Sequence, residues 1–319
     1  MNSPKRLRNC FVAGGSLAVA LFFGLANSPA RAADQPMLSG VKRIVFLGDS
    51  ITYSGQYVEY IEAYFRSHHP ARAVEFINLG LPSETVSGLS EDGHAGGQFP
   101  RPDVHERLER VLAKSKPDLV VACYGMNCGI YLPFDGERFA KYREGIQRLR
   151  DRCAQAGAKV LHVTPPTFDE VKGGHPGYGN TLDRYSEWLL GQRQKGWNVV
   201  DLHGPMNRYL AEQRAKDPMF FLAGDGVHCN ETGHWIIARQ ILLHLGAKDL
   251  AKADNPKTML AAYPKGDELL KLIQQRQRML KDAWLNECKH LRPGMGKGLP
   301  LPEAQEKAAE LEKQIRAVL

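Results

Sequence analysis

Short apolar runs alternate with longer amphipathic stretches from about residue 41 to residue 246. Runs rich in β-branched residues and flanked by turn formers are typical of buried strands, whereas apolar positions that recur every three or four residues indicate helices. This alternation predicts an α/β fold, a three-layer α/β/α sandwich built from βα units around a five-stranded parallel sheet. The predicted strands are residues 43–47, 73–79, 119–124, 159–164 and 198–202. The predicted helices are residues 57–67, 103–114, 136–156, 182–195, 205–215 and 231–245.

Two connections in this region, residues 81–101 and 165–181, are longer than the usual two to six residues. Both follow predicted strands, at the edge where open parallel sheets bind ligands. We expect them to line or cover a site there, and the alternative is that they are irregular surface loops.

The alternation ends near residue 245, and the rest of the chain predicts a helical hairpin. Residues 266–290 and 303–318 have helical periodicity, and a Pro- and Gly-rich bend lies between them. Apolar positions such as Leu269, Ile273 and Trp284 need a partner surface. We expect the second helix or the main domain to supply it, with dimerisation as the alternative, and the oligomeric state stays open.

The first 32 residues have the pattern of an export signal. Basic residues precede a 17-residue apolar stretch, and Ala30 and Ala32 fit a cleavage site. The predicted organisation is a signal peptide at residues 1–32, a main domain at residues 33–248 and a C-terminal helical appendage at residues 249–319. Cleavage would give a periplasmic or secreted protein without stable membrane insertion, and an uncleaved N-terminal anchor is the alternative.

Charge and cysteine content exclude several classes of partner. Without residues 1–32 the chain has 38 basic and 35 acidic residues, and this small excess gives no reason to expect a nucleic-acid partner. Its five remaining cysteines show no Cys-x-x-Cys pair, so we expect buried free thiols, with a Cys123–Cys153 bridge as the alternative. No spacing of His, Cys, Asp or Glu is typical of a metal site, and we expect no metal and no cofactor.

The clearest chemical signal is Ser50, which follows the first predicted strand after a glycine turn. Far downstream, Asp225 and His228 are three residues apart, and they supply the carboxylate and imidazole that a nucleophilic serine needs. Alone, Ser50 is equally typical of a helix N-cap, and Asp225 of a turn before Gly226. Together they favour serine ester hydrolysis. The chain has no Gly-x-Ser-x-Gly segment, which argues against the nucleophile elbow of α/β-hydrolases.

These residues belong to four short blocks that resemble the SGNH hydrolases, the GDSL-type esterase and lipase family. The blocks are Gly48-Asp49-Ser50, Asn78-Leu79-Gly80, Gly125-Met126-Asn127 and Asp225-Gly226-Val227-His228, in the order and spacing of that family. The resemblance spans roughly residues 41–246 and leaves the predicted hairpin outside. It implies a flavodoxin-like SGNH hydrolase fold and a serine esterase.

The resemblance also implies a role for each block. Ser50 would be the nucleophile, His228 the general base and acid, and Asp225 the group that orients the imidazole. The backbone N–H groups of Ser50 and Gly80 and the side-chain amide of Asn127 would form the oxyanion hole. Gly80 suits this role because a residue without Cβ lets the backbone approach the substrate closely.

One position departs from the family pattern, because the third block commonly continues with Asp and here has Cys128. The departure puts in doubt how rigidly Asn127 is held, and it makes Cys128 a second, weaker nucleophile candidate. His94 and His175 lie in the two long loops and are candidates for substrate contact. The other histidines, including His234, are expected to be structural.

The leading hypothesis is an exported serine esterase that forms an acyl-enzyme and removes acetyl groups from carbohydrate. The substrate would be a small-molecule or carbohydrate ester, because the loops near the site are polar and glycine-rich. A lysophospholipase or thioesterase would use the same mechanism with an apolar groove. A non-catalytic carbohydrate-binding protein of the same fold is the alternative from another class, and the presence of Ser50, His228 and Asn127 argues against it.

Overall fold

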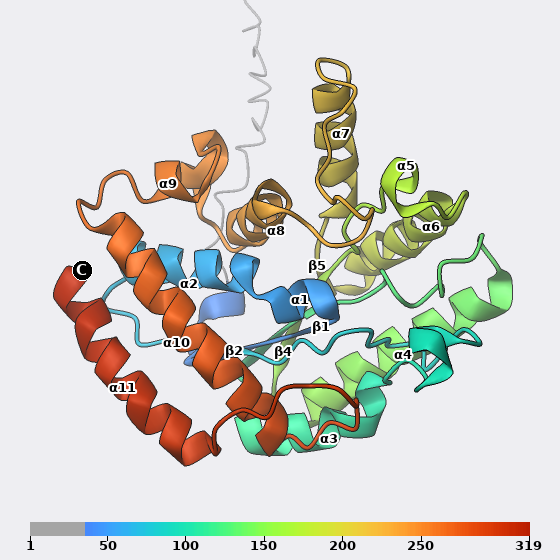
Figure 1. Cartoon of the computed structure of the whole chain (residues 1–319). Helices are drawn as coiled ribbons and strands as arrows, with labels where there is room; N and C mark the ends of the chain where they lie inside the picture. The colour runs from blue at the N-terminus through green and yellow to red at the C-terminus, as the bar shows by residue number, and fades with distance from the viewer. Residues whose placement is uncertain (1–35) are drawn as a thin grey trace, which may run out of the picture. The chain divides into compact units, whose positions relative to one another are not determined.

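The computed structural model describes residues 36–319, and the predicted signal peptide at residues 1–32 lies outside the described residues. Five parallel strands form one sheet in the order β2-β1-β3-β4-β5 (Figure 1). The strands are β1 (Arg43–Gly48), β2 (Glu75–Asn78), β3 (Leu119–Cys123), β4 (Lys159–Val163) and β5 (Asn198–Val200). All residues of β3, and all of β1 after Arg43, are buried, as expected for a parallel sheet that is covered on both faces. The predicted α/β fold and strand number are therefore confirmed.

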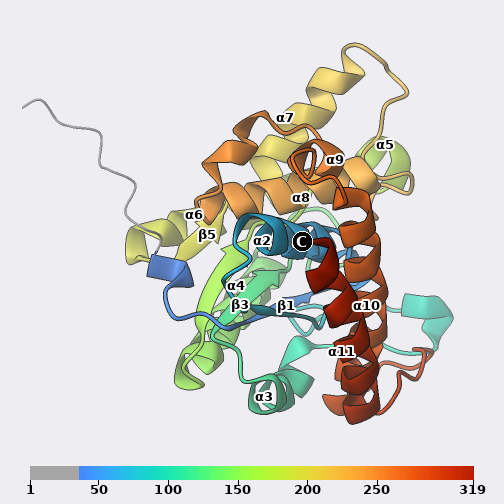
Figure 2. The ribbon, with the colours of Figure 1, turned by 90° about the vertical axis from the view of Figure 1, so that its left-hand side faces the viewer.

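Helices cover the two faces of the sheet as separate layers (Figure 2). On one face, α2 (Gln56–His68) and α8 (Glu231–His244) pack against each other. On the other face lie α3 (Val104–Ser115) and α4 (Gly136–Gln155). Each face of the sheet has its own hydrophobic core. Because side chains alternate along a strand, Phe46 of β1 packs in the core beneath α2 and α8, and Leu47 packs in the core beneath α3 and α4.

Two further helices lie near the β5 edge, and here the sequence-based boundaries need correction. The predicted helix at residues 182–195 is α6 (Tyr178–Gly191) followed by the 3-10 turn η3 (Gln192–Lys195), and the helix predicted at residues 205–215 is α7 (His203–Arg214). The predicted loop at residues 165–181 is partly helical, because it contains α5 (Glu170–Gly173) and the start of α6. Asp169 starts α5 by accepting a hydrogen bond from the Val171 N–H at 3.2 Å.

The predictions also missed several short elements. They are α1 (Ser50–Ser54), α9 (Pro256–Met259) and the 3-10 turns η1 (Pro36–Leu38), η2 (His94–Gly97) and η4 (Lys248–Lys252). Segments of three to five residues are too short to show a period of hydrophobic positions. Among them, α1 and α9 have a side-chain cap, from Asp49 and from Asn255, which accepts from the Thr258 N–H.

The C-terminal hairpin consists of α10 (Gly266–Glu287) and α11 (Leu301–Val318), which lie side by side (Figure 1). The first helix ends three residues before the predicted boundary, and Lys289 just after it has a left-handed φ of 53°. Both partners expected for its apolar face are present, because α10 packs on α11 and also on α2 and β2. The hairpin thus covers the outer edge of the sheet.

Buried polar contacts join the hairpin to that edge. Glu62 on α2 is fully buried and forms an ion pair with Arg276 on α10. Gln277 donates one hydrogen bond to Glu62 Oε2 at 2.6 Å and another to the Phe76 carbonyl of β2 at 3.1 Å. These contacts satisfy a charge and an edge-strand carbonyl that would otherwise be costly to bury.

In the described part of the chain the cysteines at positions 123, 128, 153, 229 and 288 are free thiols, four of them buried and Cys229 partly exposed. Within residues 36–319, no helix combines the length and the apolar character that spanning a bilayer requires.

Asp49 makes the short helix α1 possible at the end of β1. Its Oδ1 accepts from the Ile51 N–H at 2.9 Å, so Asp49 is the N-cap and Ser50 is the first helical residue. The carboxyl is buried, which disfavours its charged form. Burial outweighs the Ile51 hydrogen bond and raises the pKa of Asp49 from 3.8 to about 6.

This burial predicts a pH-dependent effect of Asp49→Asn, which keeps a capping oxygen and removes the charge. Because the folded-state pKa lies above the unfolded value, the stability contributed by Asp49 is present below about pH 4 and is lost as the pH rises through about 6. Relative to wild type, the variant should gain roughly 2 kcal/mol in unfolding free energy between pH 4 and pH 7.5, measured by urea denaturation.

Asp135→Asn is the matched control, since Asp135 caps α4 through the Arg138 N–H and its side chain is 42% exposed. It reports the effect of changing an N-cap without burial. The prediction would be contradicted if the unfolding free energies of wild type and Asp49→Asn differed by the same amount at both pH values.

Candidate active site

The strand order brings three predicted site residues to one end of the sheet. β1 lies between β2 and β3, and Ser50, Gly80 and Asn127 follow the carboxyl ends of these strands. The chain leaves β1 toward one face and β2 toward the other, which opens a crevice at the ends of the strands. The positions of these three residues thus follow from the topology.

Ser50 is presented by a tight turn into α1. A Cβ on Gly48 would lie 2.1 Å from Thr52 Oγ1 and 2.8 Å from the Cys123 carbonyl oxygen, so the turn requires glycine. The N-cap alternative for Ser50 is wrong, because Asp49 is the cap. The Ser50 Oγ is therefore not used in capping, and it lies 2.8 Å from His228 Nε2.

His228 and Asp225 come from the loop before α8. Asp225 Oδ2 lies 2.6 Å from His228 Nδ1, while Oδ1 accepts from the backbone N–H groups of Val227 at 3.0 Å and His228 at 2.8 Å. Asp225 therefore forms the turn with one oxygen and contacts the imidazole with the other. Partial burial raises the pKa of this carboxyl, but the hydrogen bonds from His228 and Val227 outweigh it and hold the pKa below 3.8.

The second long loop supports the loop that carries His228. The Asp169 N–H donates to the Gly226 carbonyl at 2.9 Å. Gly226 has a φ of 82°, and a Cβ there would lie 2.5 Å from Gly173. Asp169 is itself buried and paired with Arg214. The 165–181 segment thus packs against the backbone of the loop that carries His228. The side chains of Asp225 and His228 themselves are each 56% exposed.

Gly80 lies where the sequence predicted, but a different contact demands glycine. A Cβ would lie 2.4 Å from the Tyr53 N of α1, so close packing of two protein segments excludes a side chain. The Gly80 N–H donates to Asn78 Oδ1 at 2.9 Å, and Asn78 Nδ2 donates to the Thr52 carbonyl at 2.7 Å. An oxyanion at this position would share the Gly80 N–H with Asn78.

Asn127 is buried and held from both ends of its amide. Its Nδ2 donates to the Glu84 carbonyl at 3.3 Å, and its Oδ1 accepts from the Tyr131 hydroxyl at 3.0 Å. Asn127 is thus held in place although position 128 carries no carboxylate. Tyr131 was not found from the sequence, where nothing marks it except its distance of four residues from Asn127.

Cys128 is fully buried, and its Sγ accepts from the Val86 N–H at 3.4 Å. Burial raises the pKa of the thiol from 9.0 to about 12, so the reactive thiolate is strongly disfavoured. Cys128 therefore serves loop packing, and the structure argues against it as a nucleophile.

The two candidate loop histidines lie near the site without reaching the serine. The His175 ring is exposed and its centroid lies 5.1 Å from that of Tyr131. His94 contacts Glu91 at 3.3 Å and the edge of Phe99. A further residue that the sequence did not mark is Arg101, which lies over the Tyr131 ring at 5.3 Å.

A second serine and histidine pair lies close by, between α1 and α8. Ser54 Oγ on α1 is 2.9 Å from His234 Nε2 on α8. Burial lowers the pKa of His234 to about 4, and its buried Nδ1 has no hydrogen-bond partner. This pair therefore lacks the carboxylate that would orient the imidazole. Within residues 36–319, no group of three or more His, Cys, Asp or Glu side chains is placed to hold a metal ion.

Relatives of known structure or function share this architecture. The chain is 25% identical over 227 residues to an acetylxylan esterase of Geobacillus stearothermophilus, covering 64% of this chain and 94% of that one. The crystal structure of Axe2, an acetylxylan esterase from the same organism, has a TM-score of 0.51 at 22% identity, covering 65% and 95% of the two chains. The structure of a gut microbial diltiazem-metabolizing enzyme has a TM-score of 0.55 at 22% identity. The match covers 65% of this chain but only about half, 47%, of that enzyme.

A model of the GDSL-like Lipase/Acylhydrolase family matches residues 46–236, more than half of the chain. This range includes all four blocks and excludes the C-terminal hairpin. The chain therefore belongs to the GDSL-like lipase and acylhydrolase family and is a serine hydrolase that acts on ester bonds.

Proposed function

We propose that Ser50, His228 and Asp225 form the catalytic triad of this esterase. The observation that carries the proposal is the continuous chain of contacts from Ser50 Oγ through both nitrogens of His228 to Asp225 Oδ2. Serine is a weak nucleophile at neutral pH, and a base in contact with its hydroxyl removes the proton as the oxygen attacks. Asp225 keeps the imidazole oriented and stabilises its positive charge.

The reaction would run in two stages. Ser50 Oγ bonds to the ester carbonyl carbon while its proton moves to His228 Nε2, and the same proton then goes to the alcohol oxygen as the ester bond breaks. Water attacks the acyl-enzyme in the second stage, giving one proton to His228, which returns it to Ser50 Oγ as the acid leaves. Each stage passes through a tetrahedral oxyanion.

The proposed oxyanion hole consists of the Ser50 N–H, the Gly80 N–H and the Asn127 side-chain amide. Close packing of Gly80 on α1 and the contact of Tyr131 with Asn127 Oδ1 support it, because both limit movement of the donors. Preorganised donors of this kind each contribute roughly 3 kcal/mol to lowering the barrier.

We further propose that the substrate is an acetylated carbohydrate and that the protein is exported to the periplasm or secreted. The acetylxylan esterase relative supports the acetyl group, and the polar loops around an exposed His228 are compatible with a sugar. Export rests on the signal-like pattern of residues 1–32, with an N-terminal anchor as the alternative. A lysophospholipase or thioesterase remains the second candidate for the same triad.

Ser50→Ala should lower hydrolysis of p-nitrophenyl acetate by roughly a thousandfold or more, because no other group can form the acyl-enzyme. The matched control is Ser54→Ala on the same helix, which removes a hydroxyl that also contacts a histidine nitrogen. This control should retain activity within a few-fold. Equal rates for wild type and Ser50→Ala would remove the nucleophile assignment, and selective loss with Ser54→Ala would move it to the second pair.

Asn127→Ala should lower kcat roughly a hundredfold or more with a smaller change in KM, because the amide acts on charge that exists only in the transition state. Tyr131→Phe leaves the amide in place without its fixed orientation, so kcat should fall by a smaller factor, about three- to tenfold. Tyr263→Phe, which loses a hydroxyl contact to the Ser67 carbonyl instead, is the control. A change confined to KM in Asn127→Ala would contradict the oxyanion role.

A chain-length series tests the acyl preference. An apolar groove would gain ~0.8 kcal/mol for each buried CH₂ group, whereas a site for acetyl gains nothing from a longer chain. We expect kcat/KM for p-nitrophenyl esters to fall at least about tenfold from acetate to octanoate. Acetate release from acetylated xylo-oligosaccharides, measured by chromatography, should then exceed release from phenyl acetate. Rates that rise with chain length would favour the lysophospholipase candidate.

A further inference from the structure

A cavity of about 350 Å³ lies where the C-terminal hairpin meets the first long loop. Leu81, the residue after Gly80, lines one side of it. Arg101 lines it as well and contacts Tyr131, which holds Asn127. The cavity thus adjoins the segment that carries the Gly80 N–H, and Arg101 connects it to the residue that contacts Asn127.

Residues beyond the family match complete this cavity. Its apolar lining is Leu81, Phe99, Pro100, Pro102, Leu291 and Pro293, and the last two belong to the segment after α10. Arg110 Nε donates to the Cys288 carbonyl at 3.0 Å, and Arg292 Nε donates to the Pro82 carbonyl at 2.9 Å. The segment is therefore anchored to α3 at one end and to the loop after Gly80 at the other.

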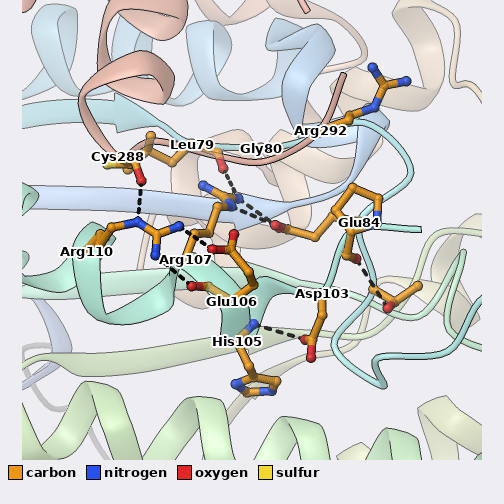
Figure 3. A network of polar contacts seen from close by, with 12 residues as sticks. Leu79, Gly80, Glu84, Asp103, His105, Glu106, Arg107, Arg110, Cys288 and Arg292 are labelled. Atoms are coloured by element: carbon orange, nitrogen blue, oxygen red, sulfur yellow. Dashed lines mark hydrogen bonds and ion pairs between the residues drawn. The ribbon is translucent and has the colours of Figure 1, made fainter. Parts of the chain in front are cut away.

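The carboxylates that line the cavity already have partners. Glu84 pairs with the buried Arg107 at 2.6 Å, and Glu106 pairs with Arg110 at 2.6 Å (Figure 3). Asp103 lies 3.6 Å from Arg148. Arg101 is likewise neutralised, because Glu91 contacts its guanidinium at 2.6 Å.

Arg292 is the exception among the charged residues of this lining. No carboxylate in residues 36–319 lies within ion-pair distance of it, and its guanidinium donates only to the carbonyls of Pro82 and Pro293 while lying 5.1 Å from the Phe99 ring centre. Figure 3 shows it apart from the paired network around Glu84 and Arg107. Arg107 adds a buried Nη1 that has no hydrogen-bond acceptor. The lining therefore combines apolar residues and paired charges with one guanidinium, that of Arg292, which has no carboxylate partner in residues 36–319.

We propose that this cavity binds the alcohol portion of the ester substrate and that this portion carries a carboxylate, which Arg292 recognises. An acetyl group is far too small to fill 350 Å³, so the occupant belongs to the alcohol side of the bond. A neutral alkyl chain would bury the charge of Arg292 against hydrocarbon, which is costly, whereas a carboxylate forms a charge-assisted pair with it. The inference deepens the proposed function and depends on it for the identity of the acyl group.

Two aryl acetates of the same shape test the proposal, 4-acetoxybenzoate and its neutral counterpart 4-acetoxybenzamide. After correction for their uncatalysed hydrolysis rates, wild-type kcat/KM should favour the benzoate about tenfold, which corresponds to ~1.4 kcal/mol. Arg292→Gln should reduce the ratio to about one, Arg292→Lys should keep part of it, and Arg292→Glu should reverse it. Added salt should weaken the wild-type preference, since the pair is partly exposed.

Lys297→Gln is the matched control, because Lys297 lies in the same segment, is exposed and does not line the cavity. It should keep the wild-type ratio, which separates a local contact from a general effect of net charge. A wild-type ratio near one, or an unchanged ratio in Arg292→Gln, would overturn the proposal.

Equilibrium binding keeps this test independent of turnover. Calorimetry with 4-hydroxybenzoate and 4-hydroxybenzamide should show tighter binding of the acid to wild type and equal binding to Arg292→Gln. If p-nitrophenyl acetate is hydrolysed but neither assay shows a preference for the acid, the cavity proposal alone is wrong. If no acetate is hydrolysed while the acid binds through Arg292, the proposed function is wrong and the anion site stands.

Discussion

The contact between Ser50 Oγ and His228 Nε2 joins segments 178 residues apart, and much of the molecule serves to hold its two ends in place. One end rests on β1, a buried strand between two others, and on the capping of α1 by Asp49. The other end rests on a four-residue turn that Asp225 organises and the 165–181 segment supports. Because hydrogen bonds weaken steeply with distance and angle, neither end can move far without loss of the pair.

The two ends differ in how they are made rigid. Ser50 follows a buried strand and lies above a buried carboxyl whose charge is disfavoured there, so packing determines its position. Asp225 and His228 are half-exposed, and short hydrogen bonds within the turn replace packing. The core therefore holds the proposed nucleophile, whereas a partly exposed loop holds the proposed base.

The sequence predicted the layers and the strands well, because long periodic segments such as residues 136–156 carry a strong pattern. Ser50, His228 and Asp225 could be named because their chemistry is recognisable together, and the topology then brought them into contact. Tyr131 and Arg292 could not be named in this way. Each acts through one contact with a distant or irregular segment, and neither lies in a motif. The close packing of Gly80 on α1 could not be predicted for a similar reason, since it exists only in three dimensions.

The contact between Gln277 and the Phe76 carbonyl spans 201 residues and connects an early strand with one of the last helices to be synthesised. While the chain is being made, β2 therefore presents an uncovered edge, and Glu62 has no cation from α10 beside it. Open strand edges of this kind associate with other chains until they are covered. Completion of the fold thus waits for the C-terminal residues, so the edge of β2 and the carboxylate of Glu62 gain their partners on α10 only when synthesis is almost finished.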